Sequence, residues 1–454
     1  MKKKEEKNVE NNKKFFKTVC SLAIPVALQS MLQSSFSIVD QIMIGQLGKV
    51  SVAGVGLVGK FTSIFSVLIA AVGTVAGIMI SQYVGQKNRR EIHRSFRINL
   101  FIVVGIAMVF MLPCAFYSQQ VMGLYTNDYD TMREAAGYFL IVTLTFVPMA
   151  GTTILSTLFR CMEKASLPLY AGIVAALLNT GLNYILIFGK FGFKPMGITG
   201  AAIATVISQA ANLIIMLVMF IKYRARFDEG YTDSGEKETF KWKQYAGILL
   251  PILVCELMWS LGENVYAGIY GHLGTDDCAA MTLINPIQGL MIGALCGLSQ
   301  AAGVIIGKLL GNKEYDDAYR ASKKLILYGF AGSAMLSVVI LLTRKYYVEI
   351  YQVEESVKTL TQQILVAYAI VAPFKVLNMI VSGGIIRSGV KTKYVMFIGI
   401  IGTWFFGVPL GLFAAFVCNL SIPYVYFILS LEECVRFGIS LVVFKRKGWM
   451  QSLK

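Results

Sequence analysis

Long apolar stretches recur along this chain of 454 residues, and short clusters of basic residues separate them. A helix needs about 20 apolar residues to cross the hydrocarbon layer of a bilayer. Composition supports the same interpretation, because 56% of the residues are hydrophobic and 15% are charged, whereas soluble domains carry about 25% charged residues. A water-soluble fold could not bury this much apolar surface. The sequence therefore predicts an all-α integral membrane protein.

Charged breaks and breaks rich in glycine or proline divide the chain into twelve candidate transmembrane helices. Their expected limits are 19–45, 53–82, 97–118, 135–158, 167–189, 197–222, 246–272, 279–307, 325–343, 361–386, 394–417 and 421–444.

The basic residues are distributed unevenly between the two sides of this topology. Thirty-two of the 42 Lys and Arg residues fall in the N-terminal arm, the loops on the same side and the C-terminus, and seven fall on the opposite side. Because short cytoplasmic loops carry an excess of Lys and Arg, we expect both termini to be cytoplasmic in a multi-pass plasma membrane protein. This distribution also explains the net charge of +16 without a nucleic-acid partner.

The two halves of the chain are repeats of one plan. A shift of 226 residues aligns residues 25–87 with the second half without a gap, and thirteen of 63 positions are identical, including Pro25/Pro251, Gly45/Gly271 and Gly77/Gly303. Six spans in each half imply parallel repeats, which predicts two pseudo-symmetric lobes around a central cavity. The expected parts are an N-terminal arm (1–18), an N-lobe (19–222), a cytoplasmic connector (223–245), a C-lobe (246–446) and a tail (447–454).

Polar residues of the first and fifth spans are candidates for a transport site. Four of them share one face of the first span, at successive spacings of four, four and three residues: Gln29, Gln33, Ser37 and Asp40. Asn179 and Asn183 lie one helical turn apart in the fifth span. Ionisable residues inside a span are costly and usually functional. The alternative is a set of interhelical hydrogen bonds that only hold the bundle together.

The C-lobe carries a different set of charges. Tyr266 stands at the repeat position of Asp40, while Glu256 and Glu263 share a face of span seven. Lys375 lies near the middle of span ten and needs an anionic or water partner. We expect an intramembrane charge pair of Glu263 and Lys375, with Glu256 as the alternative partner, and expect Lys375 to occupy the place of a bound cation.

Span twelve contains two adjacent acids, Glu432 and Glu433, followed by Arg436. The spacing of four residues between Glu432 and Arg436 permits charge compensation along one helix. We interpret these residues as a local ion pair and not as part of a transport site.

Several segments together resemble the multidrug and toxic compound extrusion (MATE) transporters. They are PVALQSMLQSSFSIVDQIMIGQLG (25–48), LLNTGLNYILIFG (177–189), MGITGAAIATVISQ (196–209), PILVCELMWSLGENVYAGIYGHLG (251–274), GVIIGKLLGNK (303–313), GGIIRSGVKTKY (383–394) and TWFFGVPLG (403–411). Their order and duplication carry the resemblance.

The resemblance implies a V-shaped twelve-helix antiporter that exports organic cations by alternating access. By position, it implies cation-coupling roles for Asp40, Asn179, Asn183 and Glu256. The expected coupling ion is a proton or sodium, with no further cofactor and no metal site. We expect a monomer whose substrate cavity includes Gln29, Gln33, Ser37, Glu256 and Tyr266.

Two other functions are considered. A flippase for lipids or lipid-linked oligosaccharides, from the same superfamily, would favour cationic cavity residues, and Lys375 is the one feature that points to it. The acidic and neutral residues of the N-lobe instead favour a cationic substrate. A membrane-embedded enzyme is not expected, because the sequence contains no HExxH-type spacing, Asp-rich metal motif or catalytic His pair.

Overall fold

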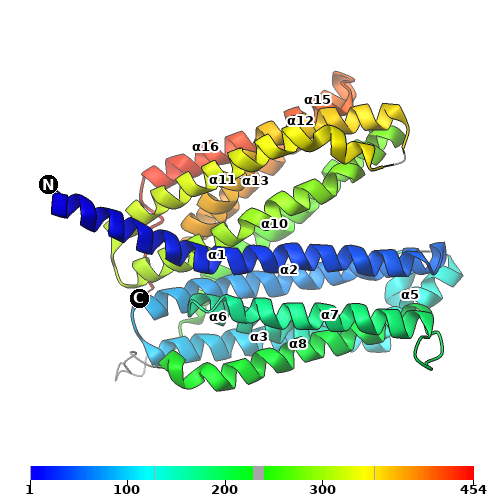
Figure 1. Ribbon diagram of the computed structural model, residues 1–454, viewed down its shortest axis with the longest axis horizontal. Helices are drawn as coiled ribbons and strands as arrows, with labels where there is room; N and C mark the ends of the chain where they lie inside the picture. The colour runs from blue at the N-terminus through cyan, green and yellow to red at the C-terminus, as the bar shows by residue number, and fades with distance from the viewer. Residues whose placement is uncertain (1, 127, 229–239, 352, 454) are drawn as a thin grey trace. The chain divides into compact units, whose positions relative to one another are not determined.

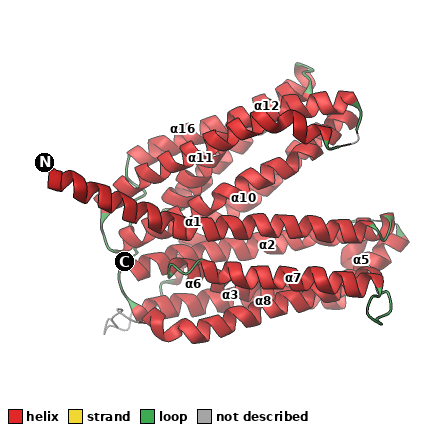
Figure 2. Ribbon diagram, in the orientation of Figure 1, coloured by secondary structure: helices red, strands yellow, loops and turns green. Residues whose placement is uncertain are grey.

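The computed structural model describes residues 2–126, 128–228, 240–351 and 353–453, and every regular element in these ranges is helical (Figure 1, Figure 2). Each predicted span coincides with helical structure. Among the described residues, eleven helical segments are long and apolar enough to cross a membrane. The all-α membrane fold expected from the sequence is confirmed.

The elements of the first half run from α1 to α8. They are α1 (Lys2–Gly45), α2 (Lys49–Gly85), α3 (Arg89–Phe116), α4 (Ser118–Gly123), α5 (Tyr129–Val142), η1 (Thr143–Thr145), α6 (Phe146–Cys161), α7 (Ser166–Phe188) and α8 (Gly197–Asp228).

The elements of the second half run from α9 to α16. They are α9 (Trp242–Leu273), α10 (Thr275–Gly311), α11 (Tyr315–Glu349), α12 (Glu355–Asn378), η2 (Met379–Ile386), α13 (Lys393–Ile400), η3 (Ile401–Gly407), α14 (Val408–Leu412), η4 (Phe413–Val417), α15 (Ile422–Ser430) and α16 (Glu432–Lys445). Of the predicted connector (223–245), residues 229–239 lie outside the described residues.

The chain divides into two compact units. We call Leu28–Glu236 the N-lobe unit, and Met1–Ala27 with Lys237–Lys454 the C-lobe unit. The division falls inside α1, two residues after Pro25. Proline lacks a backbone N–H and removes one hydrogen bond from a helix interior. The structure groups the first part of α1 with the second-half helices. The sequence, in contrast, predicted an N-lobe that starts at residue 19.

The last predicted span differs in form from the others. It consists of two shorter helices, α15 and α16, which meet at Leu431. Neither reaches the length of a single transmembrane helix, so eleven long helices are found where twelve spans were predicted. The break places Glu432 and Glu433 in the first turn of α16. Unpaired N–H groups and the helix dipole stabilise negative charge at that position.

One glycine shows how closely α1 and α10 pack inside the C-lobe unit. A Cβ atom at Gly297 would overlap the backbone carbonyl oxygen of Ala23, whereas Gly289 of the same helix has nothing within 4 Å of its Cβ position. Backbone atoms cannot rotate away as a side chain can.

We expect Gly297→Ala to push α1 away from α10 and to destabilise the protein by about 1–3 kcal/mol, the usual range for overpacking. Gly289→Ala is the matched control and should not destabilise it. Thermal unfolding of both purified variants in detergent would measure the difference. Equal stability of the two variants would contradict the close contact.

Candidate functional site

The N-lobe unit contains a chain of polar side chains that links three helices. The Nδ2 group of Asn183 on α7 donates to Oδ1 of Asp40 on α1 at 2.5 Å. The same group donates to Oδ1 of Asn179 at 3.2 Å. Asn179 in turn donates through its own Nδ2 to the hydroxyl of Ser208 on α8 at 3.4 Å. Three of the residues selected from the sequence therefore meet in one network.

Burial differs along this network. Asn183 is fully buried, whereas Asp40 is partly exposed. Tyr138 of α5 is also buried and lies close enough to Asp40 to interact with it electrostatically. A carboxylate held by a buried amide inside an apolar bundle can exchange a proton or a small cation, because its charge is poorly compensated when neither is bound.

The rest of the predicted polar stripe on α1 does not join this network. Gln33 and Ser37 are exposed, and Gln29 is partly buried. The Oε1 atom of Gln29 is buried without a hydrogen-bond partner among the described residues. These three residues share a helix face with Asp40, but among the described residues their side chains form no hydrogen bond with it.

Glu256 forms an ion pair that was not expected from the sequence. Its Oε1 accepts from Nη2 of Arg387 at 3.0 Å. The two side chains are 27% and 18% exposed, so the pair is largely removed from solvent. The alternative pairing of Lys375 with Glu256 is therefore wrong. Arg387 directly follows η2, which ends at residue 386 as the predicted tenth span does, and its side chain reaches Glu256 on α9.

A separate cavity of about 240 Å³ lies within the C-lobe unit. We call it the C-lobe cavity; its lining includes Glu263, Tyr266, Tyr270, Gln288, Tyr368, Lys375, Tyr426, Glu432 and Glu433. They come from α9, α10, α12, α15 and α16. Tyr266 was predicted to line a substrate cavity and lines this one, whereas Glu256 is absent from its lining.

Glu263 and Lys375 both line the C-lobe cavity, but they do not form the contact ion pair expected from the sequence. Within the described part of the chain, no carboxylate oxygen lies within 4.0 Å of the Lys375 ammonium. Lys375 instead experiences longer-range attraction from Glu433, Glu263 and Glu432. Three carboxylates thus share the compensation of the Lys375 charge, and none of them forms a contact ion pair with it.

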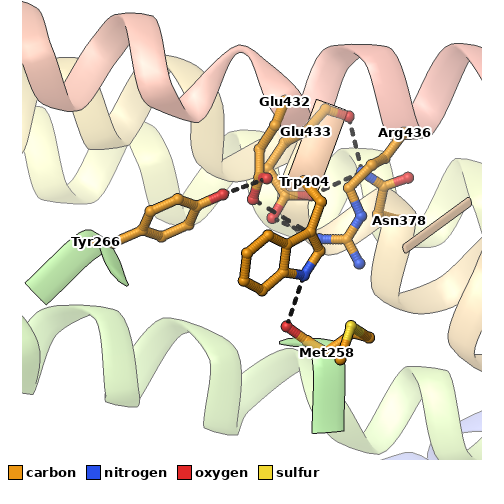
Figure 3. A network of polar contacts seen from close by, with 7 residues as sticks. All are labelled: Met258, Tyr266, Asn378, Trp404, Glu432, Glu433 and Arg436. Atoms are coloured by element: carbon orange, nitrogen blue, oxygen red, sulfur yellow. Dashed lines mark hydrogen bonds and ion pairs between the residues drawn. The ribbon is translucent and has the colours of Figure 1, made fainter. Parts of the chain in front are cut away.

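One wall of the C-lobe cavity is a buried network of charges, drawn in Figure 3. Glu432 and Glu433 are 6% and 5% exposed. The guanidinium of Arg436 lies 3.9 Å from Glu432 and 3.6 Å from Glu433. Tyr266 donates its hydroxyl to Glu432 at 2.6 Å, and Asn378 donates to Glu433 at 2.7 Å.

Gly407 leaves room for this network. A Cβ atom at Gly407 would overlap the Tyr266 hydroxyl and the Glu432 carboxylate. Gly407 ends the π-helical segment η3, which also carries Trp404. The Trp404 indole donates to the backbone oxygen of Met258 at 3.1 Å (Figure 3). Short π-helical segments are frequent at functional sites.

The sequence interpretation did not predict that Glu432 and Glu433 line the C-lobe cavity together with residues of other helices. The compensation of Glu432 by Arg436 is confirmed, but the acids also bind residues 55 and 166 positions away in the sequence, Asn378 and Tyr266. Two adjacent acids inside an apolar stretch were the available signal. One arginine cannot neutralise two carboxylates, and this imbalance indicates further partners.

Comparison with known proteins identifies the family. The MatE family model matches residues 25–185 and 251–413, which together exceed half of the chain. The chain belongs to the MATE family of transporters. The same model matches both halves, and its two matches begin 226 residues apart (251 minus 25), the shift found in the sequence repeat. This MATE chain is thus a multi-pass membrane transporter and not an enzyme.

Several relatives and solved structures are similar over most of their length. An uncharacterized transporter, YisQ of Bacillus subtilis, is 22% identical and covers 95% of this chain and 94% of its own. The human multidrug and toxin extrusion protein 1 is 23% identical, and the match covers 88% of this chain and 69% of the human protein. The crystal structure of a mutant of the Vibrio cholerae MATE transporter VcmN has a TM-score of 0.86 at 18% identity, covering 96% and 97%. At that identity the structural likeness supports the fold alone.

Proposed function

We propose that this MATE protein is a secondary antiporter that exports lipophilic organic cations, driven by a proton or sodium gradient. The observation that carries the proposal is the contact between Asp40 and Asn183 in the N-lobe unit. A single carboxylate held among neutral amides and hydroxyls can bind a coupling ion or a cationic substrate in turn. Because the coupling ion and the cationic substrate would compete for one carboxylate, entry of the ion would be coupled to export of the substrate.

Coupling is assigned to Asp40 in preference to Glu256. Glu256 already has a fixed counterion, the guanidinium of Arg387 at 3.0 Å. An arginine is always protonated and does not leave its carboxylate in exchange for a small cation without breaking a charge-assisted hydrogen bond. Asp40 contacts an amide, which supplies no compensating charge. The N-lobe unit is therefore the better place for an exchangeable ion.

The surroundings of Asp40 support a cationic substrate. Asn179, Asn183 and Tyr138 offer neutral dipoles and an aromatic ring near the carboxylate. Lipophilic cations gain charge neutralisation and apolar burial together in such an environment. The excess of Lys and Arg on one side of the predicted topology supports cytoplasmic termini and a plasma membrane location. We infer a monomer, because the polar residues of the candidate site all come from one chain.

The test uses purified protein in liposomes that contain ethidium, with a proton gradient and a sodium gradient imposed separately. We expect ethidium to be exported under at least one gradient and not in its absence. An anionic dye of similar size is the matched control and should not be moved. If ethidium is exported under neither the proton gradient nor the sodium gradient, the proposal is contradicted.

A lipid flippase is the second candidate, and the presence of Lys375 in the C-lobe cavity is the observation that favours it. The same cavity carries Glu263, Glu432 and Glu433, so its lining is acidic on balance and would repel an anionic headgroup. Fluorescent anionic lipids in the same liposomes distinguish the two functions. If anionic lipids crossed the bilayer and ethidium did not, the flippase function would replace the antiporter.

A further inference from the structure

The C-lobe cavity contains two side chains of opposite charge that form no ion pair with each other. Lys375 and Glu263 both line it. Neither forms an ion pair within 4.0 Å or a side-chain hydrogen bond with another described residue. Glu432 and Glu433, in contrast, are bound by Arg436, Tyr266 and Asn378. The cavity therefore presents one ammonium and one carboxylate to its contents.

Charges at membrane depth are costly when they lack a partner. Lys375 is half-buried, and Glu263 is the more exposed of the two side chains. We propose that the C-lobe cavity binds a small zwitterion, whose ammonium pairs with Glu263 and whose carboxylate pairs with Lys375. Such a ligand forms two charge-assisted contacts and leaves the net charge of the cavity unchanged. A simple cation would leave Lys375 unpaired and be repelled by it. A simple anion would leave Glu263 unpaired and be repelled by three carboxylates.

The size of the cavity limits the ligand. Its volume of about 240 Å³ is below the range of about 300–1,000 Å³ that is usual for drug-sized ligands. This volume suits a molecule the size of an amino acid better than a polycyclic cation. The site is therefore distinct from the path proposed for lipophilic cations, and it lies within the C-lobe unit alone.

Four tyrosines in the cavity lining indicate which kind of ammonium group the ligand carries. Tyr266, Tyr270, Tyr368 and Tyr426 line the cavity. Tyr266 and Tyr426 already have polar partners, since Tyr266 donates to Glu432 and the Tyr426 hydroxyl accepts from Gln288 at 3.0 Å. Aromatic rings in the lining can supply cation–π contact, which is the usual means of recognising methylated ammonium groups. A zwitterion with a quaternary ammonium, of the betaine type, matches this lining best.

The test measures binding of radiolabelled glycine betaine to the detergent-purified full-length protein at sub-millimolar concentration, where exclusion of betaine from protein surfaces has no effect on the result. Unlabelled choline and acetate are the competitors, because each retains one end of the zwitterion. We expect saturable binding that unlabelled betaine displaces and that neither competitor displaces at equal concentration. Displacement by choline would show a site for monocations and overturn the proposal, as would absence of binding.

Two variants place the ligand in the cavity. We expect Glu263→Gln and Lys375→Met each to weaken betaine binding about tenfold or more, since each removes one charge-assisted contact. Glu355→Gln, whose side chain is 84% exposed on the same unit, is the matched control and should bind normally. Unchanged binding in Glu263→Gln would overturn the assignment. If Lys375→Met fails to fold, the competitor results on the unaltered protein still decide the question, and none of these measurements requires transport activity.

Discussion

Asp40→Asn is expected to reduce gradient-driven ethidium export to the level of liposomes without protein. The substitution keeps the shape of the side chain and an oxygen that can accept from Asn183, as Asp40 does at 2.5 Å. It removes the negative charge, so the site can no longer alternate between a bound coupling ion and a bound cation. The protein should nevertheless remain folded, because the packing and the hydrogen bond are retained.

The controls separate the role of Asp40 from a general effect of charge. Asp130→Asn changes an exposed aspartate of the same unit and should leave export unaltered. Thermal unfolding of the Asp40→Asn protein checks that the fold is intact. Export at the normal rate by Asp40→Asn would exclude Asp40 as the coupling carboxylate, while the fold and family of the chain would stand.

The helices and the repeat could be predicted from the sequence because the bilayer imposes a fixed length on each span. Among the described residues, eleven of the twelve predicted spans coincide with helices long enough to cross a membrane, whereas the last is divided at Leu431. A division of this kind is not visible in hydropathy, since α15 and the second half of α16 are both apolar. Glu432 and Glu433, which directly follow the division, are buried.

Candidate site residues could be selected from the sequence, but their partners could not. Asp40 and Asn183 are both polar residues inside predicted spans, and they are 143 positions apart. Helix periodicity indicates which face each occupies and not which helices lie next to each other. The partner of Glu256 was missed for a related reason. Arg387 directly follows the predicted tenth span, whose end at residue 386 coincides with the end of η2. Hydropathy does not show that its side chain reaches Glu256 on α9.

In the charge network of α16, Arg436 and the acids Glu432 and Glu433 compensate one another's charges. Arg436 lies 3.6 Å from Glu433 and 3.9 Å from Glu432, and all three side chains are less than 20% exposed. Removing one member of a buried ion pair leaves an uncompensated charge and costs about 3–5 kcal/mol. Arg436→Met should therefore destabilise the protein by about that amount, measured as the free energy of unfolding in mixed micelles.

Restoring charge balance should recover much of this loss. With Glu432→Gln and Glu433→Gln added, neither acid is left uncompensated, and the amide oxygens can still accept from Tyr266 and Asn378. Glu263 still attracts the Lys375 ammonium in this variant. A mutant cycle between the arginine and the two acids isolates their coupling. Arg320→Met, which removes a largely exposed arginine paired with Asp317, is the matched control, and its cost should stay below about 1 kcal/mol. If Arg436→Met were no less stable than this control, solvent would have to compensate the two acids, and the network could not hold the wall of the C-lobe cavity in place.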